Sequence, residues 1–198
     1  MSEAEQQALW ADGRQQVWCI DPLDGTSNFV RGLPYFAISV ALLADGESKL
    51  GVVYDPVADE VFAAERGRGA FLNGDKLSGR PAVDRLADAL ANVDMKRLEG
   101  KLSAILASSP PYSSQRNFGA STLDWCYTAV GRYDVYLHGG QKLWDYAAGS
   151  LILHEAGGQM CSLDSDDFNR AAVWQRSVIA SLDARLFSEW KNWLRAQK

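Results

Sequence analysis

The chain has 198 residues, 47% of them hydrophobic, which is enough for one ordinary domain or two small lobes that share a core. Its net charge of −5 comes from 25 acidic and 20 basic residues without a long basic run, which excludes an electrostatic groove for nucleic acid. No apolar run is long enough to cross a membrane, and the polar N-terminus lacks a signal-peptide pattern. The three cysteines, an odd number without zinc-ligand spacing, favour a reducing, cytoplasmic location.

The first part of the chain is predicted to form an antiparallel meander. Four short apolar segments are typical of strands, at residues 17–20, 36–43, 49–55 and 60–65. Turn signals follow the second and the fourth of them, at Asp45-Gly46 and around Gly67. We expect residues 1–82 to form a subdomain built on this sheet.

The second part is predicted to alternate strands and helices. The patterns after Pro81 indicate, in chain order, a strand at 89–94, helices at 95–108 and 121–132, a strand at 133–138, a helix from about 143 to 155 and a strand at 177–181. An amphipathic helix with Asp183 as its N-cap closes the chain. We expect residues 83–198 to form an α/β subdomain, with the functional site between the two subdomains.

The segment DPLDGT, directly after the first predicted strand, has the chemistry of a metal and phosphate site. Its proline biases Asp21 to an extended conformation, so the turn can aim Asp21 and Asp24 at the same point. Gly25 permits close backbone approach, and Thr26 suits the start of a helical turn whose N–H groups can bind phosphate. Carboxylate oxygens beside such groups suit Mg²⁺. The alternative is an ordinary turn with solvated side chains.

A second acidic element lies much later, in the segment LWDYAAG. It places Asp145 in the first turn of a predicted helix, where the small residues Ala147, Ala148 and Gly149 would let the helix approach another backbone closely. The alternative is that Asp145 is only a helix N-terminal acid, favoured by the helix dipole.

In combination, DPLDGTSNF, WDYAAG and EAGG resemble the signatures of the inositol monophosphatase family of Mg²⁺-dependent, lithium-sensitive phosphatases. The resemblance implies the layered αβαβα sugar-phosphatase fold, of the α/β (α+β) class. It also implies a phosphomonoesterase that hydrolyses a small phosphorylated sugar or polyol, such as inositol 1-phosphate, by two-metal activation of water.

The same resemblance assigns roles to individual residues. It implies that Mg²⁺ is held by Glu3, Asp21, Asp24, Asp145 and the carbonyl of Leu23. Thr26 would orient the nucleophile, so the catalytic set is Glu3, Asp21, Asp24, Thr26 and Asp145. The substrate would contact Asp24, Gly25, Thr26, Gly119, Ala120, Ser121 and His138.

The chain departs from the family pattern near its N-terminus. The family carries a Glu-Glu pair preceded by two helices, whereas here Glu3 is followed by Ala4 and the chain starts too late for the helices. We expect the first helical layer to be missing, and Met1 to be an internal start of a longer reading frame or the start of a shortened form. Slower turnover than in an extended chain and association into a homodimer through the surface left open are further expectations.

Substrate identity is left open by the sequence. Inositol-preferring members place a glutamate seven positions before the acid matching Asp145, where this chain has His138, and this weakens the expectation of inositol. A 3′-phosphoadenosine 5′-phosphate phosphatase and a fructose-1,6-bisphosphatase are alternatives. A weakly active or non-catalytic member that binds metal and phosphate is a third.

Overall fold

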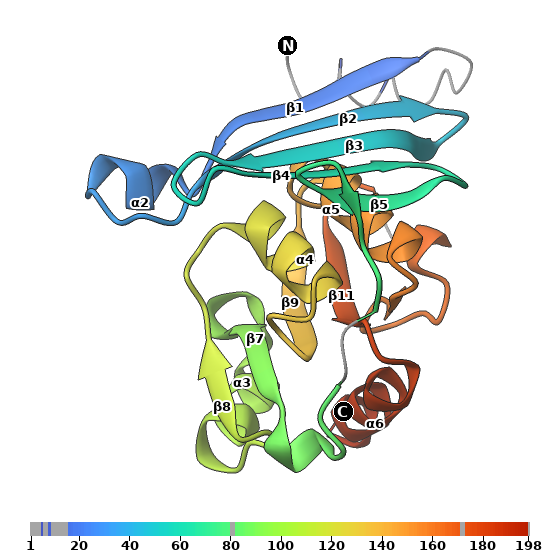
Figure 1. Cartoon of the computed structure of the whole chain (residues 1–198). Coiled ribbons are helices and arrows are strands. Elements are labelled where there is room, and N and C mark those ends of the chain that lie inside the picture. The colour runs from blue at the N-terminus through green and yellow to red at the C-terminus, as the bar shows by residue number, and fades with distance from the viewer. Residues whose placement is uncertain (1–4, 6–7, 9–15, 80–81, 171–172, 198) are drawn as a thin grey trace.

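The computed structural model describes residues 5, 8, 16–79, 82–170 and 173–197, and in them two β-sheets are separated by helices (Figure 1). The first sheet has its strands in chain order, each antiparallel to the next. The strands are β1 (Val17–Asp24), β2 (Ala37–Ala44), β3 (Glu47–Asp55), β4 (Glu60–Glu65), β5 (Gly69–Leu72) and β6 (Asp75–Lys76). The predicted meander is confirmed.

A two-residue turn joins β2 to β3. Ala44 pairs with Glu47, and the turn residues Asp45 and Gly46 have positive φ angles of 55° and 75°. A turn of this kind matches the twist of two antiparallel strands, and Asp-Gly is among the few pairs that adopt it readily. The turn predicted at this position is confirmed, and it helps to fix the register of the sheet.

The second sheet is mixed, with the strand order β10-β11-β9-β7-β8. β7 is parallel to both β8 and β9, whereas β11 is antiparallel to β9 and to β10. The strands are β7 (Leu90–Asp94), β8 (Ser114–Arg116), β9 (Val135–Gln141), β10 (Gln159–Cys161) and β11 (Arg176–Ser181). Parallel neighbours need crossover connections, and helices in the intervening chain supply them.

Helices form two layers around the second sheet (Figure 1). α4 (Ser121–Ala129) and α5 (Leu143–Glu155) lie between the sheets, and one buried hydrophobic cluster joins them to both. α3 (Gly100–Ser108) and α6 (Ala184–Ala196) cover the other face, in a cluster that includes Trp190 and Leu106. None of the described helices has the length and apolarity needed to cross a membrane. The layered α/β fold expected from the sequence is confirmed.

Small residues let α5 pack closely on both of its neighbours. A Cβ atom at Gly51 of β3 would lie 2.9 Å from the carbonyl oxygen of Ala148, and one at Gly149 would lie 2.4 Å from Cβ of Trp125 in α4. Neither contact leaves room for a side chain. The close approach predicted for Ala147, Ala148 and Gly149 is therefore present, and it places the first turn of α5 beside β1.

Several local predictions differ from the structure. β5, β6 and β8 are short, and the sequence patterns did not reveal them. The helix predicted over 95–108 is divided into the 3₁₀ helix η2 (Met95–Arg97) and α3, because the chain is extended at Leu98 and Glu99. Asp94 caps η2 by accepting from the N–H of Lys96, and Gly100 is a poor helix former. The division of the chain between residues 82 and 83 stays a prediction.

The outer face of the first sheet is apolar and exposed in the described part of the chain. Trp18 and Ile20 on β1 are 60% and 55% exposed. Two rows of cross-strand neighbours lie on this face. One consists of Ile20, Val40 and Val52, and the other of Ile38, Tyr54 and Val61. Because side chains alternate along each strand, the opposite face of the sheet packs on α4 and α5.

Candidate active site

An irregularity in β1 places Asp21 and Asp24 on the same side of the sheet. In a regular strand, residues three apart point to opposite faces. The pairing of β1 with β2 shifts between Asp21 and Asp24, and the intervening proline has no N–H to donate. Asp21 Oδ1 accepts from the N–H of Leu23 at 3.1 Å, which bends the chain locally. Both carboxylates consequently face the start of α5.

Gly25 turns the chain from β1 into the short helix α2 (Thr26–Val30). Its φ angle of 78° lies in the left-handed region that glycine adopts without strain. A Cβ atom at this position would lie 2.8 Å from the carbonyl oxygen of Tyr35 and 3.2 Å from Cβ of Ala120. Glycine therefore permits both the turn and the close packing of this segment on the start of α4.

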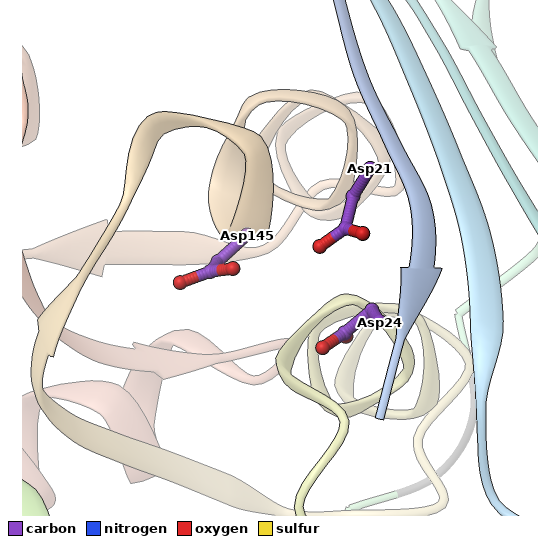
Figure 2. A group of neighbouring side chains, drawn as sticks. All are labelled: Asp21, Asp24 and Asp145. Carbon is purple, nitrogen blue, oxygen red and sulfur yellow. The ribbon is translucent and has the colours of Figure 1, made fainter. Parts of the chain in front are cut away.

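Asp145 comes from the first turn of α5. Its Oδ2 atom accepts from the N–H of Lys142 at 2.9 Å, so the side chain also caps the helix that carries it. The carboxylate lies within 4.8 Å of those of Asp21 and Asp24, measured between one oxygen atom from each (Figure 2). The structure thus brings Asp145 next to Asp21 and Asp24, which lie far before it in the sequence.

The electrostatics of this acidic cluster fit a divalent cation. Burial raises the pKa of Asp21 and of Asp145 above the ordinary value. Burial also raises the pKa of Asp24 to about 6, opposed by hydrogen bonds from Thr122 and reinforced by Asp145 and Asp21. Three carboxylates at this distance repel one another, and a hard cation with oxygen ligands would offset the repulsion. Both the donor set and its charge therefore suit magnesium.

Thr122, in the first turn of α4, fixes the orientation of Asp24. Its N–H and its hydroxyl both donate to Asp24 Oδ2 at 2.8 Å, while the N–H of Gly25 donates to Asp24 Oδ1 at 2.8 Å. The sequence analysis did not predict this role for Thr122. Its position directly after Ser121, in the segment expected to contact the substrate, was the one indication in the sequence.

The other residues of the DPLDGT segment have defined partners. The hydroxyl of Thr26 donates to the carbonyl oxygen of Leu23 at 2.8 Å, so two of the predicted site residues hold each other. That carbonyl oxygen keeps a second lone pair for a cation. Because the N–H of Gly25 already binds Asp24, contact between Gly25 and phosphate would require an exchange of partners.

Gly119, Ala120 and Ser121 lie where the chain enters α4, next to Gly25. The amide nitrogen of Asn28 donates to the carbonyl oxygens of Phe118 and Tyr35, at 2.6 and 2.7 Å, and so ties this entry to α2. The three residues therefore lie beside Gly25 and directly before Thr122, which binds Asp24, and their contact with a substrate stays a prediction.

The remaining predicted site residues are His138 and Glu3. His138 on β9 is buried, and its two ring nitrogens are occupied by Asp94 and by the N–H of Gly140. Glu3 lies outside the described residues.

A buried acid that sequence reasoning missed lies behind the site. Asp124 of α4 accepts at Oδ1 from the hydroxyl of Tyr35 at 2.8 Å and from the amide of Asn92 at 2.7 Å. Burial raises its pKa to about 8, despite these two hydrogen bonds and with repulsion from Asp24. The acid joins α4 to β7 and to the segment before β2, so it anchors the helix that holds Asp24.

Comparison with known proteins identifies relatives of the whole described fold. The model of the inositol monophosphatase family matches residues 2–194. The Nus factor SuhB of Pasteurella multocida is 42% identical over 156 residues, which are 77% of this chain and 57% of that protein. The inositol-1-monophosphatase of Mesorhizobium japonicum is 38% identical over 165 residues, 81% of this chain and 62% of that protein.

A solved structure shows the same arrangement of elements. The extragenic suppressor protein suhB from Bartonella henselae superposes with a TM-score of 0.76 at 35% identity, over 91% of this chain and 73% of that one. The chain spans little more than half the length of the relatives from P. multocida and M. japonicum.

Proposed function

This chain belongs to the inositol monophosphatase family, and from that premise we propose that it is a magnesium-dependent phosphoric monoester hydrolase acting on a small phosphorylated sugar or polyol, such as inositol 1-phosphate. The observation that carries the proposal is the convergence of Asp21, Asp24 and Asp145 on one point. The name of the relative from M. japonicum, inositol-1-monophosphatase, supports the same class of reaction.

In this proposal the chain supplies a fixed set of oxygen ligands. Asp21, Asp24, Asp145 and the carbonyl of Leu23 would hold magnesium together with Glu3. When bound, magnesium would supply activation of water and neutralisation of charge on the phosphate. Backbone N–H groups and Thr122 hold the aspartates in place, so the oxygens need little rearrangement when the cation binds.

Other side chains would position the reactants. Thr26, held on the carbonyl of Leu23, would present its hydroxyl oxygen to the attacking water. We propose the amides of Gly25 and Thr26 as phosphate contacts. Gly119, Ala120 and Ser121 at the start of α4 would border the alcohol half of the substrate, since Ala120 packs against Gly25.

A second candidate function is binding without turnover. The name Nus factor, carried by the SuhB relatives, favours a protein that keeps the acidic cluster and acts by association. A 3′-phosphoadenosine 5′-phosphate phosphatase and a fructose-1,6-bisphosphatase are alternative activities of the same site.

Phosphate release from inositol 1-phosphate, 3′-phosphoadenosine 5′-phosphate and fructose 1,6-bisphosphate tests the proposal at saturating Mg²⁺. We expect Asp145→Asn and Asp24→Asn to lower turnover by at least about 100-fold, because changing even the partner of a ligand often costs 10- to 100-fold. Asp88→Asn is the matched control, since Asp88 is exposed and pairs only with Arg85 in the described residues. Magnesium binding without release of phosphate from any ester would favour the second candidate.

We also propose that the chain forms a homodimer through the outer face of the first sheet. The support is the exposed apolar surface that runs from Trp18 and Ile20 across Val52 to Val61. Contiguous apolar surface on a folded protein is typical of an interaction site.

A further inference from the structure

Asp94 and His138 form a pair at the edge of the second sheet where the parallel ladder of β7 and β9 ends. Asp94 ends β7, and His138 is its neighbour in the parallel ladder with β9. β9 leads directly into α5, which carries Asp145 in its first turn. Ligands of open α/β sheets bind outside the carboxyl ends of parallel strands, which is where this pair lies.

The turn after β9 places the pair near the proposed metal site. β9 ends at Gln141 and α5 begins at Leu143, and the N–H of Lys142 between them donates to Asp145 Oδ2 at 2.9 Å. His138 lies on one side of Asp94 in the sheet, and Arg97 follows Asp94 in η2. The alcohol half of a phosphate ester held at the acidic cluster would therefore extend toward this edge.

His138 has no ring nitrogen to offer to a substrate. Its Nδ1 atom lies 3.1 Å from the backbone nitrogen of Gly140, and because that group can only donate, Nδ1 must accept. The ring proton is therefore on Nε2, which lies 3.1 Å from Asp94 Oδ2 and donates to it. The side chain of His138 is only 4% exposed.

Asp94 is the more accessible member of the pair, with 18% of its side chain exposed. Its Oδ1 atom accepts from the N–H of Lys96 at 3.0 Å, and Oδ2 accepts from His138. Burial opposes ionisation, but the bonds from His138 and Lys96 hold the pKa of Asp94 below its usual value. The group is an anion with a further lone pair on each oxygen, so it can accept hydrogen bonds from a ligand.

Close backbone packing fixes Asp94 in this position. A Cβ atom at Gly139 would lie 1.8 Å from the carbonyl oxygen of Arg97 and 3.1 Å from the nitrogen of Leu98. The segment after Asp94 consequently rests directly on β9, next to His138. A rigid acceptor binds a ligand more tightly than a mobile one does, because less order is lost on binding.

We infer that Asp94 is the residue of this chain that reads the alcohol half of the substrate, by accepting hydrogen bonds from its hydroxyl groups, and that His138 positions it. The inference rests on the proposed function and names its substrate class. A polyol or sugar monophosphate with hydroxyl groups toward this edge is favoured. Esters without a hydroxyl group leave Asp94 without a ligand partner, and a second phosphate near it would be repelled.

The test compares kcat/KM for inositol 1-phosphate with kcat/KM for phenyl phosphate, whose alcohol half has no other hydroxyl group. We expect Asp94→Ser to lower the ratio of the two by about 10-fold, a difference of about 1.4 kcal/mol. Serine can still cap the N–H of Lys96, so the turn is kept. Asp88→Asn should leave the ratio unchanged.

Two variants of His138 separate positioning from direct contact. His138→Gln can keep a donor near the place of Nε2 and should retain most of the preference for inositol 1-phosphate. His138→Leu removes the donor and should lose part of it. An unchanged ratio in Asp94→Ser, or equal losses in His138→Gln and His138→Leu, would overturn the inference. Should Asp94→Ser fail to fold, Asp94→Asn takes its place.

Failure of the proposed function gives a different result. In that case the wild-type chain releases phosphate from neither ester, and calorimetry with Mg²⁺ then measures the affinity for each ester. A preference for inositol 1-phosphate that Asp94→Ser reduces by about 10-fold supports the inference without catalysis. Equal affinities of the wild-type chain for the two esters overturn it.

Discussion

Asp24 depends on a neighbour from a distant part of the chain. One of its oxygens accepts both hydrogen bonds from Thr122, and the other accepts from Gly25. Burial raises the pKa of Asp24 to about 6. The hydrogen bonds from Thr122 act in the opposite direction, because they favour the ionised carboxylate that a cation requires. Thr122 therefore orients a predicted metal ligand and favours its charged form.

Replacement of Thr122 by valine should weaken binding of Mg²⁺ by roughly 10-fold, in line with other groups that orient a metal ligand. The shape of the side chain is kept, but one of the two bonds to Asp24 Oδ2 is lost. Calorimetric titration with Mg²⁺ measures the effect. Thr128→Val is the matched control, because Thr128 lies in the same helix and donates to the carbonyl of Asp124. Equal affinities in the two variants would contradict the prediction.

Asp124 should make the stability of the protein depend on pH. Burial raises its pKa in the folded state from 3.8 to about 8, so the folded chain keeps a proton that the unfolded chain loses. The associated stability is complete below about pH 4 and is lost as the pH rises toward 8. Asp124→Asn removes this loss while keeping an oxygen that can accept from Tyr35 and Asn92.

Urea denaturation at pH 5 and pH 8 in EDTA measures how much the free energy of unfolding changes with pH in the wild-type chain and in Asp124→Asn. Between these values the wild-type chain should lose at least about 1.4 kcal/mol more stability than Asp124→Asn, the equivalent of one pKa unit. The raised pKa of Asp24 also lowers stability as the pH rises, and it does so in both proteins. The difference between the two proteins in stability lost therefore reports on Asp124. Parallel pH profiles would show that Asp124 ionises normally in the folded state.

Sequence reasoning predicted the acids of the site but missed the residues that hold them. Asp21, Asp24 and Asp145 stand in short segments whose composition indicates their chemistry. Thr122 and Asp124 lie in an ordinary helical segment, and their roles arise only when α4 packs against β1 and β7. A tertiary contact of this kind leaves no local pattern in the sequence.

The position of α5 is fixed by close packing that only glycine residues permit. Gly51 meets its backbone on one side, and Gly149 meets Trp125 on another. Glu155 at the C-terminal end of the helix accepts from the N–H of Gly67, in the turn after β4, and from the N–H of Gly69, at the start of β5, both at 2.9 Å. The position of Asp145 is thus determined along the whole length of the helix.

Gly149→Ala should destabilise the protein by about 1–3 kcal/mol, the usual cost of added volume in a packed core. The new methyl group would lie 2.4 Å from Cβ of Trp125, which requires α4 and α5 to move apart. Urea denaturation checks the result. Gly100→Ala is the control, because a Cβ atom there meets nothing within 4 Å and should leave stability nearly unchanged. A stable Gly149→Ala protein would mean that the helices separate easily.

The longer elements were predictable because each has a clear period or cap. The first four strands, α5 and α6 with its Asp183 cap follow this rule. β8 was not predictable, since its three residues, Ser114–Arg116, are polar and pair only because β7 lies next to them. The break at Leu98 has local signals in the Asp94 cap and in Gly100, but the packing of η2 on Gly139 that accompanies it is a tertiary contact.

The exposed apolar face of the first sheet should cause the whole molecule to self-associate. We predict that Trp18→Lys combined with Val52→Lys shifts the chain toward the monomer, because both side chains are exposed on that face. Size-exclusion chromatography with light scattering over a range of concentrations measures the shift. Leu33→Lys combined with Val57→Lys is the control, since these exposed residues lie in loops. A wild-type chain that stays monomeric at every concentration would rule out the dimer.

The order of strands in the first sheet has a consequence for how the protein folds. Neighbouring strands there are also neighbours in the sequence, so each pairing closes only a short loop and costs little chain entropy. The acidic cluster requires contact between Asp21 and Asp145, which closes a long loop. We therefore expect the first sheet to form early and cation affinity to arise late. In pulsed hydrogen exchange during refolding, amides of β2 and β3 should become protected before those of α5, and simultaneous protection would contradict this order.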